Sequence, residues 1–184
     1  MTCSLLKITA AFAISTCFAT AAFAGPKDFH KGTVITQFGE VATVDANMTV
    51  PKRTKFKVLF DAGKAAETGS VNRTLNSAAR FLNMHAEAGA AEKNMKVAIV
   101  FHGKASFDIT KAAYYGEKYD GAENATAGLV KALTEKGVRV ILCGQTAAYY
   151  DISNDDLLPG VEMALSAMTA HALLQQQGYT LNPF

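Results

Sequence analysis

Residues 96–103 read KVAIVFHG, an uninterrupted apolar run from Val97 to Phe101 that ends at His102 and Gly103. A continuous apolar run of this length is typical of a strand buried on both faces, because a strand with one face in water alternates apolar and polar residues. Strands of that kind occur in parallel sheets that helices cover on each side. The stretch therefore predicts a central strand of a parallel sheet.

The segments around this run alternate between strand and helix patterns. Residues 55–60 and 138–142 have the composition of two further core strands. The segment from Ser70 to Gly89 carries apolar residues at helical spacing and ends on a glycine, and residues 124–137 carry a second helical pattern that Asn124 can cap. Repeated strand–helix units require parallel strands joined by right-handed crossovers, with helices on both faces of the sheet. The predicted fold class is α/β, in three layers α/β/α.

The remaining segments have weaker patterns. Residues 104–121 fit a short helix and a mobile loop, and residues 146–150 can start a helix. Residues 161–165 alternate after a Pro-Gly break and predict a fourth short strand, and residues 167–177 predict a terminal helix. Residues 25–53 are rich in β-branched residues and predict an extended arm that could form one hairpin.

Residues 1–24 have the pattern of a secretory signal peptide. Lys7 supplies the positive charge, residues 8–20 are apolar or small, and residues 22–24 read AFA, a cleavage site before Gly25. The apolar stretch is short for a membrane span, and no second such stretch follows. We expect export to the periplasm, with cleavage after Ala24 and no membrane-spanning segment.

The rest of the chain suits one domain. Residues 25–184 remain once the signal peptide is removed, and a chain of that length can bury a core. We expect an arm over residues 25–53 and one α/β domain over residues 54–184. Of the 18 Lys and Arg and the 16 Asp and Glu, only Lys7 lies in the signal peptide, so the remaining charge is 17 − 16, or +1. A net charge this close to zero does not indicate the basic surface that binds nucleic acid, so we expect no nucleic-acid partner.

Cys143 is the one cysteine outside the predicted signal peptide, which holds Cys3 and Cys17. It closes the apolar run 138–142 and precedes Gly144. Structural cysteines of exported proteins are normally paired, so this thiol is buried, paired between chains, or reactive. In open α/β sheets, reactive groups gather beyond the carboxyl ends of the strands, where Cys143 lies.

His102 has the same kind of position after the preceding strand. The stretch from His102 to Cys143 has the length of one crossover unit with a generous loop, so the two strands can be neighbours. A helix after Cys143 would favour the thiolate through its backbone N–H groups, and the imidazole could accept the proton. We take both as candidate catalytic residues. A cysteine closing an apolar strand can equally be packing, and a histidine there often only hydrogen-bonds a loop.

Other kinds of site lack support in the sequence. The four histidines are scattered without the short spacings of zinc sites, and one cysteine cannot build a thiolate cage. The Gly-Lys pairs at 63–64 and 103–104 lack the frame of a phosphate-binding loop. The G-x-S-x-G, H-E-x-x-H and C-x-x-C motifs do not occur. We therefore expect no metal and no cofactor.

Five segments together match a known pattern, most specifically the Gly-Val-strand-Cys-Gly-Gln stretch of residues 137–145. The segments are 97–105, 124–137, 138–145, 157–161 and 178–179. From about Lys55 to Phe184, the chain resembles the exported branch of the DsrE/DsrF-like proteins. This resemblance implies a mostly parallel sheet of about five strands between helices and assembly into trimers or hexamers. It also places Cys143 where family members carry persulfide sulfur in sulfur oxidation or tRNA thiolation.

Three hypotheses for function follow. The first is a periplasmic sulfur carrier, rather than a stand-alone enzyme, in which Cys143 exchanges sulfane sulfur with donor and acceptor proteins or small sulfur compounds. The second is a non-catalytic oligomeric module with a ligand or partner cleft near His102, Tyr114 and Tyr149, where Cys143 only packs. The third is a thiol–disulfide sensor that forms a Cys143 bridge between chains.

Overall fold

Five parallel strands form one sheet in the order β4-β3-β2-β1-β5. This computed structural model describes residues 25–183, so the predicted signal peptide lies outside the described residues. The strands are β1 (Phe56–Ala62), β2 (Met95–Phe101), β3 (Arg139–Cys143), β4 (Val161–Ala164) and β5 (Thr180–Asn182). The predicted parallel sheet is confirmed.

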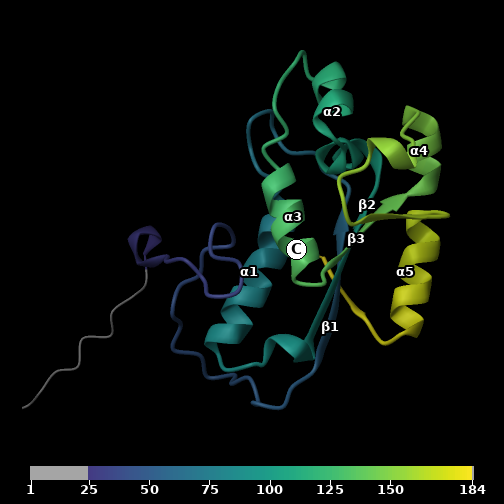
Figure 1. The fold of residues 1–184 in the computed structure, drawn as a ribbon. Helices are drawn as coiled ribbons and strands as arrows, with labels where there is room; N and C mark the ends of the chain where they lie inside the picture. Colours follow the sequence, from purple (N-terminus) through teal and green to yellow (C-terminus); the bar gives the residue numbers. More distant parts are fainter. Residues whose placement is uncertain (1–24, 184) are drawn as a thin grey trace, which may run out of the picture.

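Helices cover the sheet on both faces. They are α1 (Arg73–Glu87), α2 (Ala112–Lys118), α3 (Ala127–Glu135), α4 (Gly144–Tyr150) and α5 (Ala167–Gln176). Short 3-10 turns form η1 (Pro26–Asp28), η2 (Glu92–Asn94), η3 (Gly103–Ile109) and η4 (Asn154–Asp156). Figure 1 shows α1 and α3 on one side of the strands and α5 on the other. The three-layer α/β/α architecture follows from this arrangement.

The central strand β2 is apolar throughout its buried length because both of its faces are covered. Val97, Ile99 and Phe101 pack in the larger core on the side of α1 and α3. Ala98 and Val100 point the other way and pack in a smaller core with α5. Each of these five side chains is at most 2% exposed. Alternation along a strand sends successive side chains to opposite faces, so a strand between two helical layers needs apolar residues at every position.

Helix α1 lies within the predicted segment from Ser70 to Gly89; it begins at Arg73, after Val71, and ends before Gly89 as predicted. The side chain of Asn72 accepts hydrogen bonds from the N–H groups of Thr74 and Leu75, at 3.0 and 3.2 Å. Gly89 follows the helix with φ +91°, a conformation that side-chain-bearing residues rarely adopt.

Asn124 does not cap α3, contrary to the prediction. The helix begins at Ala127 with Thr126 as its N-cap residue. The side chain of Asn124 instead accepts from the N–H of Thr126 and donates to the carbonyls of Asp108 and Thr110, at 3.0 and 2.9 Å. It therefore ties the turn before α3 to η3.

The segment between β2 and α3 contains more regular structure than the sequence indicates. Both η3 and α2 lie within it, and Phe107 packs its ring against Tyr114, Tyr119 and Tyr150. The Tyr114 hydroxyl donates to the Tyr150 carbonyl. Contacts between aromatic rings, rather than helical periodicity, stabilise this segment.

The N-terminal arm folds back over α1, at the dark end of the ribbon in Figure 1. Within residues 25–53, all of them described, no strand forms, and one antiparallel bridge joins His30 to Val41. Val34 and Ile35 are buried in the larger core. The suggested hairpin is reduced to a single bridge because the backbone of this segment bonds to side chains of α1 instead of to itself.

Candidate functional site

Cys143 lies at the point where β3 passes directly into α4. It is the last residue of the strand, and Gly144 is the first of the helix. A Cβ on Gly144 would lie 2.5 Å from the Ala164 carbonyl oxygen and 3.0 Å from that of Leu165. The lack of a side chain at Gly144 therefore lets the chain turn into α4 close against the end of β4.

Groups at the beginnings of two helices lower the pKa of the Cys143 thiol. Burial by itself raises the pKa of the thiol, but hydrogen bonds from the Thr146 hydroxyl and the N–H groups of Thr146, Ala167 and Gln145 outweigh it. The net pKa is lowered from the ordinary 9.0. Gln145 and Thr146 belong to the first turn of α4, and Ala167 is the first residue of α5. The arrangement favours a thiolate, although the residue is only 6% exposed.

Cys143 ends β3 and His102 directly follows the neighbouring strand β2, and the two residues are on the same face of the sheet. Strands β2 and β3 pair with Phe101 opposite Leu142, so His102 and Cys143 occupy the next position of the register. Ile141 and Val100, two residues earlier in each strand, pack in the smaller core beside α5. Since side chains two apart share a face, Cys143 and the extended residue His102 also face α5.

The His102 ring lies toward β1, on the side away from β3. Its Nε2 is 3.0 Å from Asp61 Oδ2. A Cβ on Gly63 would lie 2.7 Å from the His102 Cε1, so the ring covers a residue without a side chain. The backbone links His102 to the thiol site, because the N–H of Gly103 donates to the Thr146 hydroxyl at 3.2 Å.

Asp61 also contacts His171 of α5, a residue that the sequence alone did not single out for this site. His171 Nε2 lies 2.9 Å from Asp61 Oδ1, as an ion-pair contact rather than an aligned hydrogen bond. In the sequence, Asp61 reads only as the polar end of a strand. His102 follows only after α1, η2 and β2, and His171 lies in α5, so no local pattern reveals either partner of Asp61.

Tyr114 and Tyr149, suggested as walls of a cleft with His102, lie in different environments. Tyr114 is buried in the larger core, where its hydroxyl bonds to the Tyr150 carbonyl. Tyr149 is 79% exposed on α4 and packs edge-on against Tyr150. Tyr114 therefore packs in the core, whereas Tyr149 lies on the surface.

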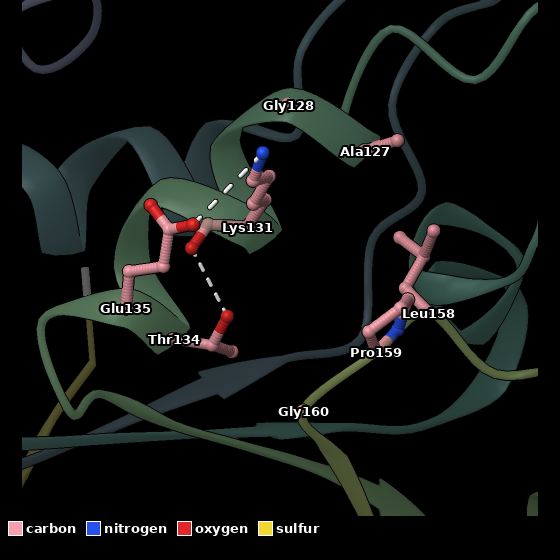
Figure 2. Close-up of a pocket in the computed structure, with 8 residues that line it drawn as sticks. All are labelled: Ala127, Gly128, Lys131, Thr134, Glu135, Leu158, Pro159 and Gly160. Carbon is pink, nitrogen blue, oxygen red and sulfur yellow. Dashed lines mark hydrogen bonds and ion pairs between the residues drawn. The ribbon is translucent and has the colours of Figure 1, made fainter.

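Two hollows bear on where a ligand could approach. A hollow of about 770 Å³ lies between α3 and the segment leading into β4, where Leu158 and Pro159 face the helix in Figure 2. Its lining ends at Gly160, before β4 begins, whereas Cys143 pairs with Ala164 at the end of β4. A second hollow of about 420 Å³ is lined by Gly144, Gln145, Asn154 and residues 163–165, which include the chain neighbour of Cys143 and its partner on β4, Ala164.

The described residues 25–183 contain no cluster of three or more His, Cys, Asp or Glu that could hold a metal ion. In the same part of the chain, no helix has the length and apolar character needed to cross a membrane. Cys143 is a free cysteine.

A separate buried polar cluster fixes the loops on the other face of the sheet. Asp108 is fully buried, and its Oδ2 accepts hydrogen bonds from the N–H of Ala66 and the amide of Asn72, at 2.8 and 2.7 Å. Its Oδ1 and the Ser106 hydroxyl have no partner among the described residues. Burial raises the pKa of Asp108 above the ordinary 3.8, and the two hydrogen bonds oppose this rise without cancelling it.

Asp108 is expected to make the folded state less stable as the pH rises. A carboxyl with a raised folded-state pKa favours folding below its ordinary pKa of 3.8, and this contribution is lost as the pH rises through the folded-state value. Asp108→Asn removes the ionisable group. The free energy of unfolding of this variant should therefore fall less than that of wild type as the pH rises from 3.8 through the folded-state pKa of Asp108. Urea unfolding at a series of pH values measures both. Parallel curves would contradict the prediction.

Comparisons with known proteins agree with this architecture. Similar solved structures include a protein of unknown function, MTH1491, from Methanobacterium thermoautotrophicum, and the ychN protein from E. coli. The first is 21% identical, covers 71% of this chain and 100% of its own, with a TM-score of 0.53. The second is 22% identical, covers 70% of this chain and 99% of its own, with a TM-score of 0.51. At these identities the likeness concerns the fold.

No curated protein matches the chain. The model of the DsrE/DsrF-like family matches residues 55–183, which include all five strands and the Cys143 site. The chain therefore belongs to the DsrE/DsrF-like family, whose members are generally sulfur-transfer proteins.

Proposed function

We propose that this protein is a periplasmic sulfur carrier in which Cys143 accepts sulfane sulfur as a persulfide and passes it to another thiol. The observation that carries the proposal is the position of Cys143 at the end of β3, where the first turn of α4 and the first residue of α5 together lower the pKa of the thiol. Sulfur exchange needs a nucleophilic thiolate, and these donors stabilise one.

The reaction needs no cofactor. The Cys143 sulfur attacks the outer sulfur of a donor persulfide, R–S–SH, and a new S–S bond forms. The S–S bond of the donor breaks, and R–S⁻ leaves and takes up, through solvent, the proton that the Cys143 thiol released on ionisation. The product, Cys143–S–SH, then delivers its outer sulfur to an acceptor thiol by the same exchange. Sulfur is transferred without net oxidation.

The proposed compartment and assembly have different support. Periplasmic location follows from the signal-peptide pattern of residues 1–24. The family resemblance supports a trimer or hexamer, and large apolar side chains exposed on α4, on α5 and between β4 and α5 fit contacts with other chains. These are Tyr149, Leu165 and Met168, which are 72–79% exposed. The proposed partners are sulfur donors and acceptors, whether proteins or small sulfur compounds.

Sulfur loading tests the proposal directly. The purified protein is incubated with a sulfane donor such as a low-molecular-weight persulfide, and its intact mass is recorded. We expect the mass of wild type to increase by one sulfur atom and that of Cys143→Ser to stay unchanged. No gain on wild type, or an equal gain on both proteins, would disprove the role of Cys143.

The 6% exposure of Cys143 favours one alternative, a binding module in which the thiol only packs. Thiol accessibility separates the two functions. For the carrier, we expect a small alkylating reagent to modify Cys143 in the folded protein. Modification only after unfolding would support the binding module. A covalent dimer on a nonreducing gel after mild oxidation would indicate the thiol–disulfide sensor instead.

A further inference from the structure

The N-terminal arm is attached to α1 in two parts, of which the second is held more weakly. Residues 30–41 are fixed by five hydrogen bonds with the buried Asn83 side chain and by one backbone bridge. Residues 42–50 have far fewer contacts of this kind. Within the part of the chain that the structure describes, one hydrogen bond joins them to another element, from the Thr43 hydroxyl to Glu87 Oε1 at 2.9 Å. The second part of the arm therefore depends on a single carboxylate.

Apolar packing does little to hold this second part. A hollow of about 400 Å³ lies between residues 42–50 and the end of α1, and residues 43–49 are all exposed. The walls of the hollow include Val44, Met48 and Met84, which are 72%, 91% and 45% exposed. Side chains this exposed contribute little hydrophobic stabilisation. Residues 42–50 can therefore leave α1 without opening the core.

The carboxylate that holds Thr43 also contacts His30. Glu87 is the last residue of α1, and its Oε2 lies 3.0 Å from His30 Nε2. The other ring nitrogen, Nδ1, faces the Asp28 carbonyl at 3.5 Å. Only an imidazolium carries a proton on both nitrogens, so the two acceptors favour the charged ring. The carboxyl end of α1 favours a cation as well, because the negative end of the helix dipole lies there.

We propose that His30, Glu87 and Thr43 form a pH-sensitive clasp that closes residues 42–50 over the end of α1. The His30 imidazolium holds the Glu87 carboxylate within reach of the Thr43 hydroxyl, and the neutral ring holds it less firmly. Loss of the proton from His30 thus opens residues 42–50 and separates the two walls of the hollow. The clasp lies on the side of α1, opposite the face on which Cys143 lies, and it does not depend on the proposed sulfur chemistry.

The pH range of the clasp follows from both ionisable groups. The hydrogen bond with Glu87 raises the pKa of His30 above the ordinary 6.5, so its contribution is complete below pH 6.5 and is lost as the pH rises through the folded-state value. Hydrogen bonds from Thr43 and His30 lower the pKa of Glu87 below the ordinary 4.5, so its contribution is present above pH 4.5 and is lost as the pH falls through the folded-state value. The clasp is therefore firmest between pH 4.5 and 6.5.

Other charged groups of the arm and of the last turns of α1 have their own partners or are exposed. The Asp28 carboxylate accepts an N–H from its own turn. Arg80 donates to the Glu40 carbonyl at 2.8 Å, and His85 Nδ1 lies 2.8 Å from a carbonyl one turn earlier in α1. The remaining charged side chains of the arm are exposed, namely Lys27, Lys31, Glu40, Asp45, Lys52 and Arg53. The pH dependence of opening should therefore reflect His30 and Glu87.

Limited proteolysis over a range of pH tests the clasp. Thermolysin cleaves before large apolar residues, so opening exposes cuts at Val44, Met48 and Val50, which mass spectrometry locates. At each pH, the cleavage rate of His30→Gln is divided by that of wild type, which cancels the pH dependence of the protease. We expect the variant to be cut about 2- to 5-fold faster at about pH 6, the range for an exposed ion pair. At about pH 8.5 the two rates should converge, because the wild-type ring loses its charge.

Substitutions at Thr43 separate the hydroxyl from the ion pair. Thr43→Ala should be cut faster than wild type at about pH 6, although NMR titration should still place the pKa of His30 above 6.5. Thr43→Ser keeps the hydroxyl and is the matched control, with the cleavage rates of wild type. Glu87→Gln should be cut as fast as Thr43→Ala and should bring the pKa of His30 down toward 6.5.

Three results would overturn the clasp. The first is a ratio of His30→Gln to wild-type cleavage that stays constant with pH. The second is a Thr43→Ala protein that is cut at the wild-type rate, and the third is resistance of residues 42–50 in every variant. Sulfur loading of Cys143 plays no part in these measurements, so failure of the clasp leaves the proposed function standing.

Discussion

Replacing Asn83 with alanine is expected to release the N-terminal arm and to lower the free energy of unfolding by about 3–5 kcal/mol. The fully buried Asn83 side chain accepts from the N–H groups of Val34 and Ile35, at 3.1 and 2.8 Å. Its amide also donates to the carbonyls of Ile35, Phe38 and Gly39, each at 3.0 Å. One side chain thus satisfies five backbone groups of a segment that forms no strand of its own.

The loss should be large because those backbone groups would stay buried without partners unless the arm leaves α1. Urea unfolding measures the change, and limited proteolysis should reveal new cleavage within residues 30–50. Asn76→Ala is the graded control, since Asn76 makes a single bond to the arm, from the N–H of Gly39 at 2.9 Å. It should cost about 1 kcal/mol. An Asn83→Ala protein as stable as Asn76→Ala would show that the arm is held mainly by its apolar side chains.

A methyl group at Gly144 is expected to lower the free energy of unfolding by about 1–3 kcal/mol and to slow the reaction of the Cys143 thiol at neutral pH. The added Cβ would lie 2.5 Å from the Ala164 carbonyl oxygen, a backbone atom that cannot turn away as a side chain could. Relief requires α4 to move away from the end of β4. That movement separates the N–H donors of α4 and α5 around the sulfur.

Gly116→Ala is the matched control for this substitution. Gly116 lies in α2, and a Cβ there meets nothing closer than 3.6 Å. Alanine should raise stability by about 0.5–1 kcal/mol, because it restricts the unfolded chain more than glycine does. Urea unfolding and the rate of iodoacetamide modification measure both variants. If Gly144→Ala matches wild type in both measurements, the close contact of Gly144 with the end of β4 is not needed for the stability of the protein or for the reactivity of the Cys143 thiol.

Much of the candidate site could be predicted because it depends on where strands end. The apolar run before Cys143 and the one before His102 each identify a strand buried on both faces, and parallel strands end at the same edge. Neighbouring strands then follow from the length of the crossover between them. The catalytic roles of Cys143 and His102 remain predictions.

Structural features could not be predicted where their sequence pattern is too short or where they depend on residues far away in the chain. Strand β5 has three residues, and its pairing with β1 rather than any alternation defines it. Asn124 looks like a helix cap in the sequence, yet its side chain bonds to η3. The arm lies ahead of the family's matched residues and adopts its path because of Asn83, which is far along the chain.

Local periodicity in the sequence was enough to predict the α/β class, the central strand and the position of the lone thiol at a strand end, since burial imposes that periodicity on consecutive residues. The surroundings of the thiol depend on the tertiary fold. The first residue of α5 helps to lower the pKa of the thiol, and Asp61 contacts both His102 and His171. These contacts join residues of different elements, and packing of α5 on the sheet, rather than any spacing in the sequence, brings them into one site.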